Sequence, residues 1–247
     1  MSGHSKWATI KRKKAANDSK RGKLFAKLIR AIEVAARQGG GDPEGNAVLA
    51  TAIAKARASA VPVDNIDRAI ARATGSADTT HYDEVWYEGY APGGIAILVQ
   101  VLTDNRNRAA SEVRASFTRN GGSLGEPGSV GYLFEKKGYI EVEGEEDDVL
   151  AAALDAGAED VRPGEGTVEV ITAPFDLVAV ERSLESAGLR VVTAEVTQLP
   201  KAVIPVDAAS AGRLLRLVDA LEDLEDVQAV FGNYEIPEEL MARLADE

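Results

Sequence analysis

The chain has 247 residues, of which 45% are hydrophobic, and its formal net charge is −12. This length and composition are typical of one or two domains, sometimes three small ones, with buried cores. The absence of cysteine excludes disulfides, thiolate metal sites and a cysteine nucleophile. The charged N-terminus has no apolar run behind it, and no stretch approaches the roughly 18 apolar residues of a membrane span. We therefore expect a cytoplasmic protein with no secretory signal and no membrane partner.

The charge is divided unevenly along the chain. Residues 1–75 hold 15 Lys and Arg against 6 Asp and Glu, a net charge of +9. Residues 76–247 hold 13 against 34, a net charge of −21. A basic module attracts phosphate backbones and an acidic body repels them. We expect the N-terminal end to contact nucleic acid while the rest faces away or meets another partner.

Helical spacing dominates the N-terminal region. Residues 20–37 are predicted to be helical, with an apolar stripe made of Leu24, Phe25, Leu28, Ile29 and Ile32. A separate cationic stripe on the same helix consists of Lys20, Lys23, Lys27 and Arg30. The glycines at 39–41 end this helix. Asp42 and Pro43 predict the start of an Ala-rich helix that runs to about residue 60, and Asp64 is expected to cap a third.

The remainder alternates strand and helix signals. Residues 95–102 are an apolar run typical of a buried strand, and Asp104 or Asn105 can cap the helix that follows. Residues 121–129 predict a glycine-rich loop and residues 130–134 a short strand. Residues 138–199, with one more edge strand, fit a β-α-β-β-α-β unit of the ferredoxin-like kind. A strand, a helix and a final strand are expected at 202–206, 209–221 and 227–234.

These elements predict an α+β multidomain protein. It has a helical N-terminal domain plus two α/β (ferredoxin-like) domains, one inserted in the other. The predicted domains are residues 1–76, basic and helical; residues 77–134 with 202–240, a split α/β domain; and residues 135–201, the inserted domain. The alternative is two α/β units that follow one another along the chain.

The dense cations near the N-terminus are the first candidate site. Ten Lys and Arg lie between residues 6 and 30, where Asp18 is the single acid. Cations pair with phosphates, and an indole can stack on an exposed base. A solvated surface, with Trp7 inside the small helical core, is the alternative. The predicted nucleic-acid-binding residues are Lys6, Trp7, Lys11, Arg12, Lys13, Lys14, Lys20, Arg21, Lys23, Lys27 and Arg30.

A second candidate binding loop contains Asn105, Arg106 and Arg108. It lies at a strand-to-helix junction, where polar groups often serve binding. Helix capping and ordinary surface charge explain these residues equally well. His4 and His81 are separated in the sequence, and the 121–129 loop lacks the lysine and hydroxyl of a P-loop. We therefore predict no catalytic residue, no metal site, no cofactor and no small-molecule substrate.

Several multi-residue motifs, in order and over essentially the whole chain, resemble the YebC/PmpR family. They are GHSKW at 3–7, IKRKK at 10–14, GGDP at 40–43, PVDNIDRAI at 62–70, YEGYAPGG at 87–94, LTDNRNR at 102–108 and GGSLG at 121–125. Two places depart from the family pattern. Residues 46–50 lack the arginine that commonly follows the Asn and Leu of the second helix, and Ala60-Val61-Pro62 replaces an Asn-Met-Pro turn. These departures weaken a phosphate contact from the second helix and leave the first-helix patch untouched.

The resemblance implies three domains, one helical and two α/β, with one α/β domain inserted in the other. It implies a regulator of gene expression that binds promoter DNA, without enzyme activity or cofactor. The family is also described as ribosome-associated translation factors, which would contact ribosomal RNA or tRNA and relieve stalling at difficult sequences such as proline runs. The attraction between cations and phosphates does not separate these two functions, because it does not depend on the sugar.

Overall fold

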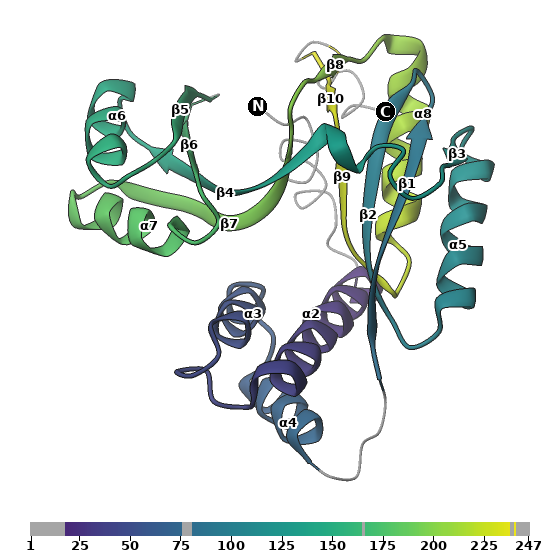
Figure 1. Cartoon of the computed structure of the whole chain (residues 1–247), viewed down its shortest axis with the longest axis horizontal. Coiled ribbons are helices and arrows are strands. Elements are labelled where there is room, and N and C mark those ends of the chain that lie inside the picture. The colour runs from purple at the N-terminus through teal and green to yellow at the C-terminus, as the bar shows by residue number, and fades with distance from the viewer. Residues whose placement is uncertain (1–17, 76–80, 165, 238–239, 241–247) are drawn as a thin grey trace. The chain divides into compact units, whose positions relative to one another are not determined.

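The computed structural model describes residues 18–75, 81–164, 166–237 and 240, with side chains from residue 21 onward (Figure 1). These residues form two compact units, one made of residues 18–130 and 207–230, the other of 131–206 and 231–240. The predicted α+β class, with helices first and sheets after them, is confirmed. The division into three domains stays a prediction.

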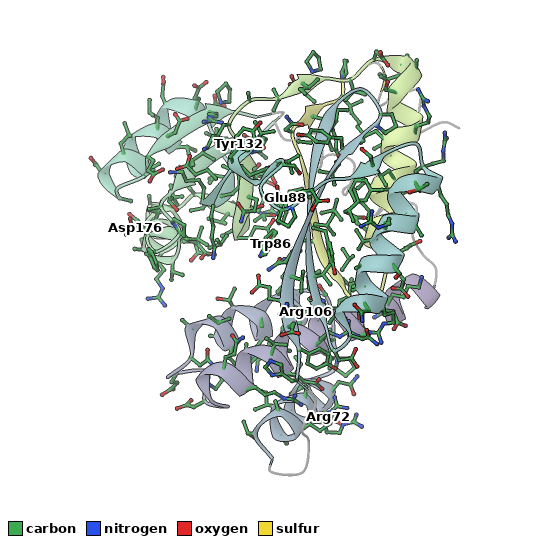
Figure 2. The ribbon with its side chains drawn as sticks, turned by 45° about the vertical axis from the view of Figure 1, so that its right-hand side comes forward. Arg72, Trp86, Glu88, Arg106, Tyr132 and Asp176 are labelled. Atoms are coloured by element: carbon green, nitrogen blue, oxygen red, sulfur yellow. The ribbon has the colours of Figure 1, made fainter. Side chains whose placement is uncertain are left out.

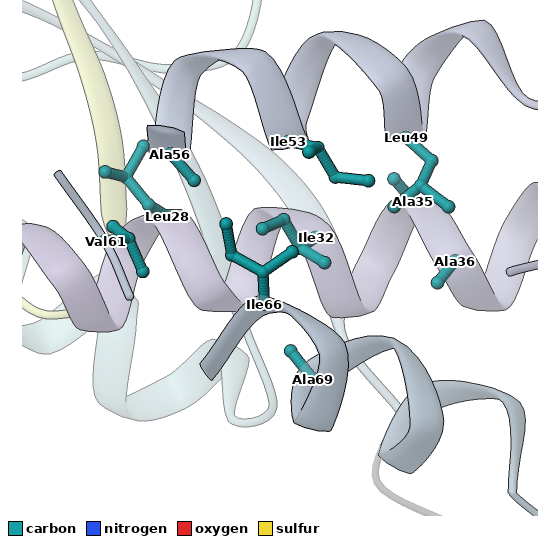
Figure 3. Close-up of a cluster of buried hydrophobic side chains, with 10 residues drawn as sticks. All are labelled: Leu28, Ile32, Ala35, Ala36, Leu49, Ile53, Ala56, Val61, Ile66 and Ala69. Atoms are coloured by element: carbon teal, nitrogen blue, oxygen red, sulfur yellow. The ribbon is translucent and has the colours of Figure 1, made fainter. Parts of the chain in front are cut away.

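The first unit opens with three helices, α2 (Asp18–Gly39), α3 (Ala47–Ala58) and α4 (Val63–Thr74). Helix α2 packs against both of the others. Their shared core is a cluster of aliphatic side chains in which isoleucines and leucines alternate with alanines (Figure 3). Ile32, Leu49 and Ile66 are almost completely buried there. Most of the predicted apolar stripe of α2 therefore faces this core, whereas Leu24 is 45% exposed.

The second helix begins later than the sequence predicts, at Ala47 instead of Pro43. Residues 43–45 form a turn, and the Asp42 carboxylate accepts a hydrogen bond from the Glu44 N–H (3.0 Å). An Asp side chain often bonds to the backbone two residues on, which favours a turn over a helix. Asp64 likewise lies inside the first turn of α4 and does not cap it.

The N-cap of α3 is Asn46, a buried residue that joins this helix to the end of α2. Its Oδ1 accepts from the Leu49 N–H at 3.1 Å. Its Nδ2 donates to the carbonyl oxygens of Ala35 and Gly40, both at 2.9 Å. One amide side chain thus satisfies a helix donor and two carbonyls near the end of α2, which would otherwise be costly to bury.

The same unit contains a sheet in the order β3-β1-β2-β9 (Figure 1). Its strands are β1 (Asp83–Ala91), β2 (Ile95–Thr103), β3 (Ser123–Leu124) and β9 (Val227–Gly232). Strands β1 and β2 form an antiparallel hairpin from Asp83 opposite Thr103 to Ala91 opposite Ile95. The sequence analysis predicts β2 but neither β1 nor β3. Strand β9 comes from the C-terminal segment, although the other three strands all precede residue 125.

Two helices pack in this unit, α5 (Arg106–Arg119) and α8 (Ala208–Glu222). Helix α5 contacts β1, β2, β3 and α8. Gly89 of β1 allows the close approach, since a Cβ there would lie 2.6 Å from the Ser123 carbonyl oxygen and 2.7 Å from the Phe117 ring. The C-terminal helix and strand thereby complete a layered core that begins more than a hundred residues earlier in the chain.

The second unit contains a sheet in the order β5-β6-β4-β7, with every neighbouring pair antiparallel. Its elements are β4 (Phe134–Glu143), α6 (Glu146–Asp155), β5 (Asp160–Pro163), β6 (Val168–Thr172), α7 (Leu177–Ser186) and β7 (Arg190–Pro200). This order and connectivity are the ferredoxin-like arrangement that the sequence predicts. Both helices pack over a core that includes Val142, Val149 and Leu184.

Two further features complete this unit. Short strands β8 (Ile204–Pro205) and β10 (Tyr234–Glu235) form a parallel pair. The strand predicted at residues 130–134 is wrong. One turn of 3₁₀ helix, η1 (Gly131–Leu133), precedes β4, which starts at Phe134.

We predict that Asn46→Ala lowers the free energy of unfolding by about 2 to 4 kcal/mol, because it removes a helix cap and leaves two carbonyls without their donor. Urea unfolding measures the change. Asn46→Asp is the matched control, since Asp can still cap Leu49 but cannot donate to the two carbonyls. We expect Asp to recover only about 1 kcal/mol of the loss. An Ala variant as stable as the wild type would contradict the role assigned to this amide.

Candidate nucleic-acid interface

The structure describes part of the predicted interface. Lys6, Trp7, Lys11, Arg12, Lys13 and Lys14 lie outside the described residues, and Lys20 is described only as backbone within α2. In the sequence, residues 1–17 hold five Lys and Arg and no acid. Residues 18–75 hold ten Lys and Arg against six Asp and Glu. More than half of the +9 charge of the basic region therefore precedes the first described helix.

The cationic stripe of α2 is bonded within the first unit. Lys23 Nζ donates to the carbonyl oxygen of Asp223 at 3.3 Å, and Lys27 Nζ donates to that of Glu222. These carbonyls belong to the C-terminal end of α8, where the last backbone acceptors lack partners within the helix. The partial negative charge of a helix C-terminus also favours a cation. The two lysines therefore cap α8 from α2.

Arg30 extends the same contact to the turn after α8. Its Nη1 lies 2.9 Å from the Glu225 carbonyl oxygen, 3.3 Å from that of Leu102 and 2.7 Å from Asp226 Oδ1. The Arg30 side chain is 17% exposed and that of Asp226 only 4%. Tyr82 stacks on the guanidinium, with 5.4 Å between Cζ and the ring centroid. Arg30 is therefore a packed residue whose charge has an internal partner.

The Asp226 carboxylate accepts hydrogen bonds from three parts of the unit. Besides Arg30, the Thr103 hydroxyl donates to Oδ2 at 2.7 Å and Arg108 Nη2 donates to Oδ2 at 2.8 Å. The backbone of Asp226 is also bonded, since the Leu102 N–H donates to its carbonyl oxygen at 2.8 Å. We call these residues, Arg30, Thr103, Arg108 and Asp226, the Asp226 cluster.

The second predicted binding loop is also engaged inside the unit. Asn105 is the N-cap of α5 and accepts from the Arg108 N–H at 3.1 Å. Arg106, at the first turn of α5 (Figure 2), pairs with Asp83 at 2.7 Å. Arg108 bonds to Asp104 and to Asp226. Asn105 is therefore a cap, as the alternative expects, and the two arginines are paired with acids of the same unit. A role of these three residues in binding stays a prediction.

The ionisation of the Asp226 cluster follows from its surroundings. Burial by itself raises the pKa of Asp226, but the hydrogen bonds from Arg108 and Thr103, together with the nearby guanidinium charges, outweigh it and lower the pKa below its usual value. The hydrogen bonds to Asp226 and Asp104 raise the pKa of Arg108. Both groups are therefore charged at neutral pH and hold each other in that state.

Other cations of the helical region lie at its surface. Arg21 is exposed, and its Cζ lies 5.4 Å from the centroid of the Phe25 ring. Arg57 is exposed in the last turn of α3. Arg68 bonds to Asn65 at 2.6 Å, and Arg72 pairs with the nearly buried Glu33 at 2.5 Å (Figure 2). Among the described cations of the predicted α2 patch, Arg21 is thus exposed and has no acidic or carbonyl partner in the hydrogen bonds and ion pairs described above.

Sequence reasoning missed Asp226. It lies in the acidic stretch LEDLED at 221–226, where nothing distinguishes it from solvent-facing neighbours. A weak signal is that the apolar strand β9 follows directly, so this acid lies where the chain enters the core. Within the described ranges, no three His, Asp or Glu residues are grouped so as to hold a metal ion, and no helix is long and apolar enough to cross a bilayer.

We predict that Asp226→Asn destabilises the protein by about 2 to 3 kcal/mol at pH 7, less than a fully buried pair because Arg108 is 44% exposed. Since the native pKa of Asp226 is lowered, its contribution is present above the unfolded-state pKa of about 3.9 and disappears as the pH falls through the native value. Urea unfolding of both proteins between pH 7 and pH 3 should show the difference shrink below about pH 4. Asp104→Asn, which removes an exposed partner of Arg108, should cost less than about 1 kcal/mol. A pH-independent difference would contradict this assignment.

Comparisons with known proteins agree over nearly the full length. A model of the TACO1/YebC N-terminal domain matches residues 5–76, and a model of the TACO1/YebC second and third domains matches residues 82–234. Proteins from Thermobifida fusca and Beutenbergia cavernae, each named a probable transcriptional regulatory protein, are both 56% identical, over 99% and 100% of this chain and 100% of their own. The crystal structure of Aq1575 from Aquifex aeolicus, a conserved hypothetical protein, is 48% identical with a TM-score of 0.79, covering 90% of this chain and 93% of that one. This chain belongs to the TACO1/YebC family.

Proposed function

We propose that this protein is a regulator of gene expression that binds DNA near promoters, with the basic segment at residues 6–14 and Arg21 as its main phosphate contacts. The observation that carries the proposal is the charge division. Residues 1–17 hold five cations and no acid, on a chain whose residues 76–247 have a net charge of −21. The names of the relatives from Thermobifida fusca and Beutenbergia cavernae support the regulatory role.

The proposed mechanism is non-covalent. Lys and Arg side chains displace counterions from the phosphate backbone, and Trp7 stacks on a base where one is exposed. The acidic remainder stays away from the phosphates and is free to meet a protein partner. Binding of this kind uses no metal, cofactor or small-molecule substrate, and it takes place in the cytoplasm with the nucleic acid.

The internal contacts of α2 refine which cations bind. Lys27 and Arg30 bond to carbonyl oxygens and to Asp226, so their charges stabilise the first unit. Lys23 is exposed but bonds to Asp223. We therefore propose that the stripe orients α2, while the residues that precede the helix supply the charge that phosphates neutralise.

The internal contacts of α2 favour a second candidate function, a translation factor that binds ribosomal RNA or tRNA on the ribosome. A helix that reads an operator places its polar face in the major groove. The cationic face of α2 is instead held against the end of α8. Contact with the backbone alone suits irregular RNA, where shape and phosphates are recognised more than base edges.

We predict that Lys11/Arg12/Lys13/Lys14→Ala weakens binding and leaves folding intact. On duplex DNA, the slope of log K against log salt should fall by up to about 3.6, because each of the four phosphate contacts contributes about 0.9. Fluorescence anisotropy over a salt series measures the slope, and the thermal midpoint should not change. Lys27→Met is the matched control. It should lower the free energy of unfolding by about 1 kcal/mol and cause little loss of binding.

The two candidate functions separate by partner. The wild type and the four-residue variant are titrated against labelled promoter duplex, non-specific duplex and ribosomal RNA. Lysates that contain each protein are sedimented through sucrose gradients. Tighter binding to promoter duplex supports the DNA-binding regulator. Wild type that sediments with ribosomes, while the four-residue variant stays at the top, supports the translation factor. A variant that binds every probe as tightly as the wild type would refute the assigned segment.

A further inference from the structure

Helix α5 carries the opposite charge to the body in which it lies. Its 14 residues hold four arginines and one glutamate, a net charge of +3. The rest of residues 76–247 holds 9 Lys and Arg against 33 Asp and Glu. A basic helix on an acidic body requires an explanation, because interspersed charge would be expected at an ordinary solvated surface.

The four arginines of α5 fall into two groups. Arg106 and Arg108, in the first turn, pair with Asp83, Asp104 and Asp226, as described above. Arg114 and Arg119 are exposed farther along the helix. Among the described residues, none forms a hydrogen bond or ion pair with the guanidinium group of either one. Internal pairing therefore explains the first two arginines and leaves the second two without a structural role.

A shallow hollow lies between these two arginines on the outer side of α5. Ala110, Ser111, Ala115 and Thr118 line it together with Arg114 and Arg119. The opposite side of the helix packs into the core through Ala109, Val113 and Phe117. The two arginines are the long side chains of the hollow, and its other four lining residues are small. An extended backbone can therefore approach the helix closely between two guanidinium groups.

We propose that the outer face of α5 is a second contact for the sugar–phosphate backbone of a nucleic acid, in which Arg114 and Arg119 each bind a phosphate. This inference rests on the proposed function. Guanidinium groups bind phosphate oxygens in a bidentate manner. Five residues rise about 7.5 Å along the helix axis, and the phosphates of one strand follow one another about every 3.4 Å along the axis of a duplex, so two long guanidinium side chains can reach two phosphates of the same strand.

The chemistry of the hollow favours a nucleic acid over a protein segment. Protein partners usually anchor through large aromatic or aliphatic side chains in a desolvated pocket. The hollow here is open and shallow, and its small lining residues do not enclose such an anchor. Residues 76–247 outside α5 are strongly acidic and would repel a polyanion. Within this part of the chain, α5 is therefore the favoured place for a nucleic acid to bind.

The test compares variants with equal changes in charge. Arg114→Gln/Arg119→Gln removes both proposed contacts, and Arg213→Gln/Arg216→Gln is the control, since these residues are exposed on α8 of the same unit. Labelled duplex DNA and labelled RNA of the same sequence serve as probes, in anisotropy titrations over a salt series. Circular dichroism melting confirms that each variant is folded.

We expect the α5 variant to bind more weakly and its salt slope to fall by about 1.5 to 2 relative to the wild type, since two phosphates are no longer neutralised. The α8 control should keep the wild-type slope. Arg114→Lys/Arg119→Lys, which keeps the charge but not the bidentate geometry, should recover most of the slope and less of the affinity.

The outcomes separate this inference from the proposed function. Equal behaviour of the α5 variant and the α8 control, with the variant at residues 11–14 still impaired, would overturn the α5 contact and leave the proposed function standing. Absence of binding by the wild type to either probe would overturn both. A fall in slope confined to the α5 variant, on DNA, RNA or both, supports the inference.

Discussion

The buried carboxylate of Asp226 and its arginine partners are the interaction on which the first unit depends. Arg30 comes from the N-terminal helix and Arg108 from the start of α5, while Asp226 itself precedes the last strand of the sheet. Thr103 adds a hydroxyl donor from the end of β2. Residues that are 118 to 196 positions apart in sequence are thereby joined at one point. The loss of the carboxylate would leave both guanidinium groups without this partner, and that of Arg30 is only 17% exposed.

Contacts inside the first unit also limit how many cations of the N-terminal region can bind phosphate. A count of Lys and Arg treats every cation as available, but a lysine can instead donate to a neutral carbonyl oxygen. Lys23 and Lys27 donate to carbonyl oxygens at the end of α8, where backbone oxygens lack helical partners. The cations of α2 therefore hold the unit together, and the electrostatic attraction for nucleic acid falls to the residues before the helix.

The same distinction explains the two ends of α5. Its N-terminal arginines neutralise acids that the fold brings to them, whereas Arg114 and Arg119 extend from a face that nothing in the described structure covers. A protein with a net charge of −12 can bind polyanions when its cations are gathered on particular faces and its acids lie elsewhere. Steep dependence on salt is the expected property of such binding, whether the partner is DNA or RNA.

The sequence by itself determined the features that depend on local spacing. Apolar periodicity located α2 and β2, the β-α-β-β-α-β pattern located the ferredoxin-like unit, and the charge division separated a basic end from an acidic body. Tertiary structure alone decided which partner each polar group receives. Asn46 in place of Asp42 as the cap, the short strand β3, and the bonds of Lys27 and Arg30 all depend on groups brought together by packing. The physical reason is that hydrogen-bonding side chains are satisfied by whatever acceptor the fold places within reach, and distance along the chain carries no information about that placement.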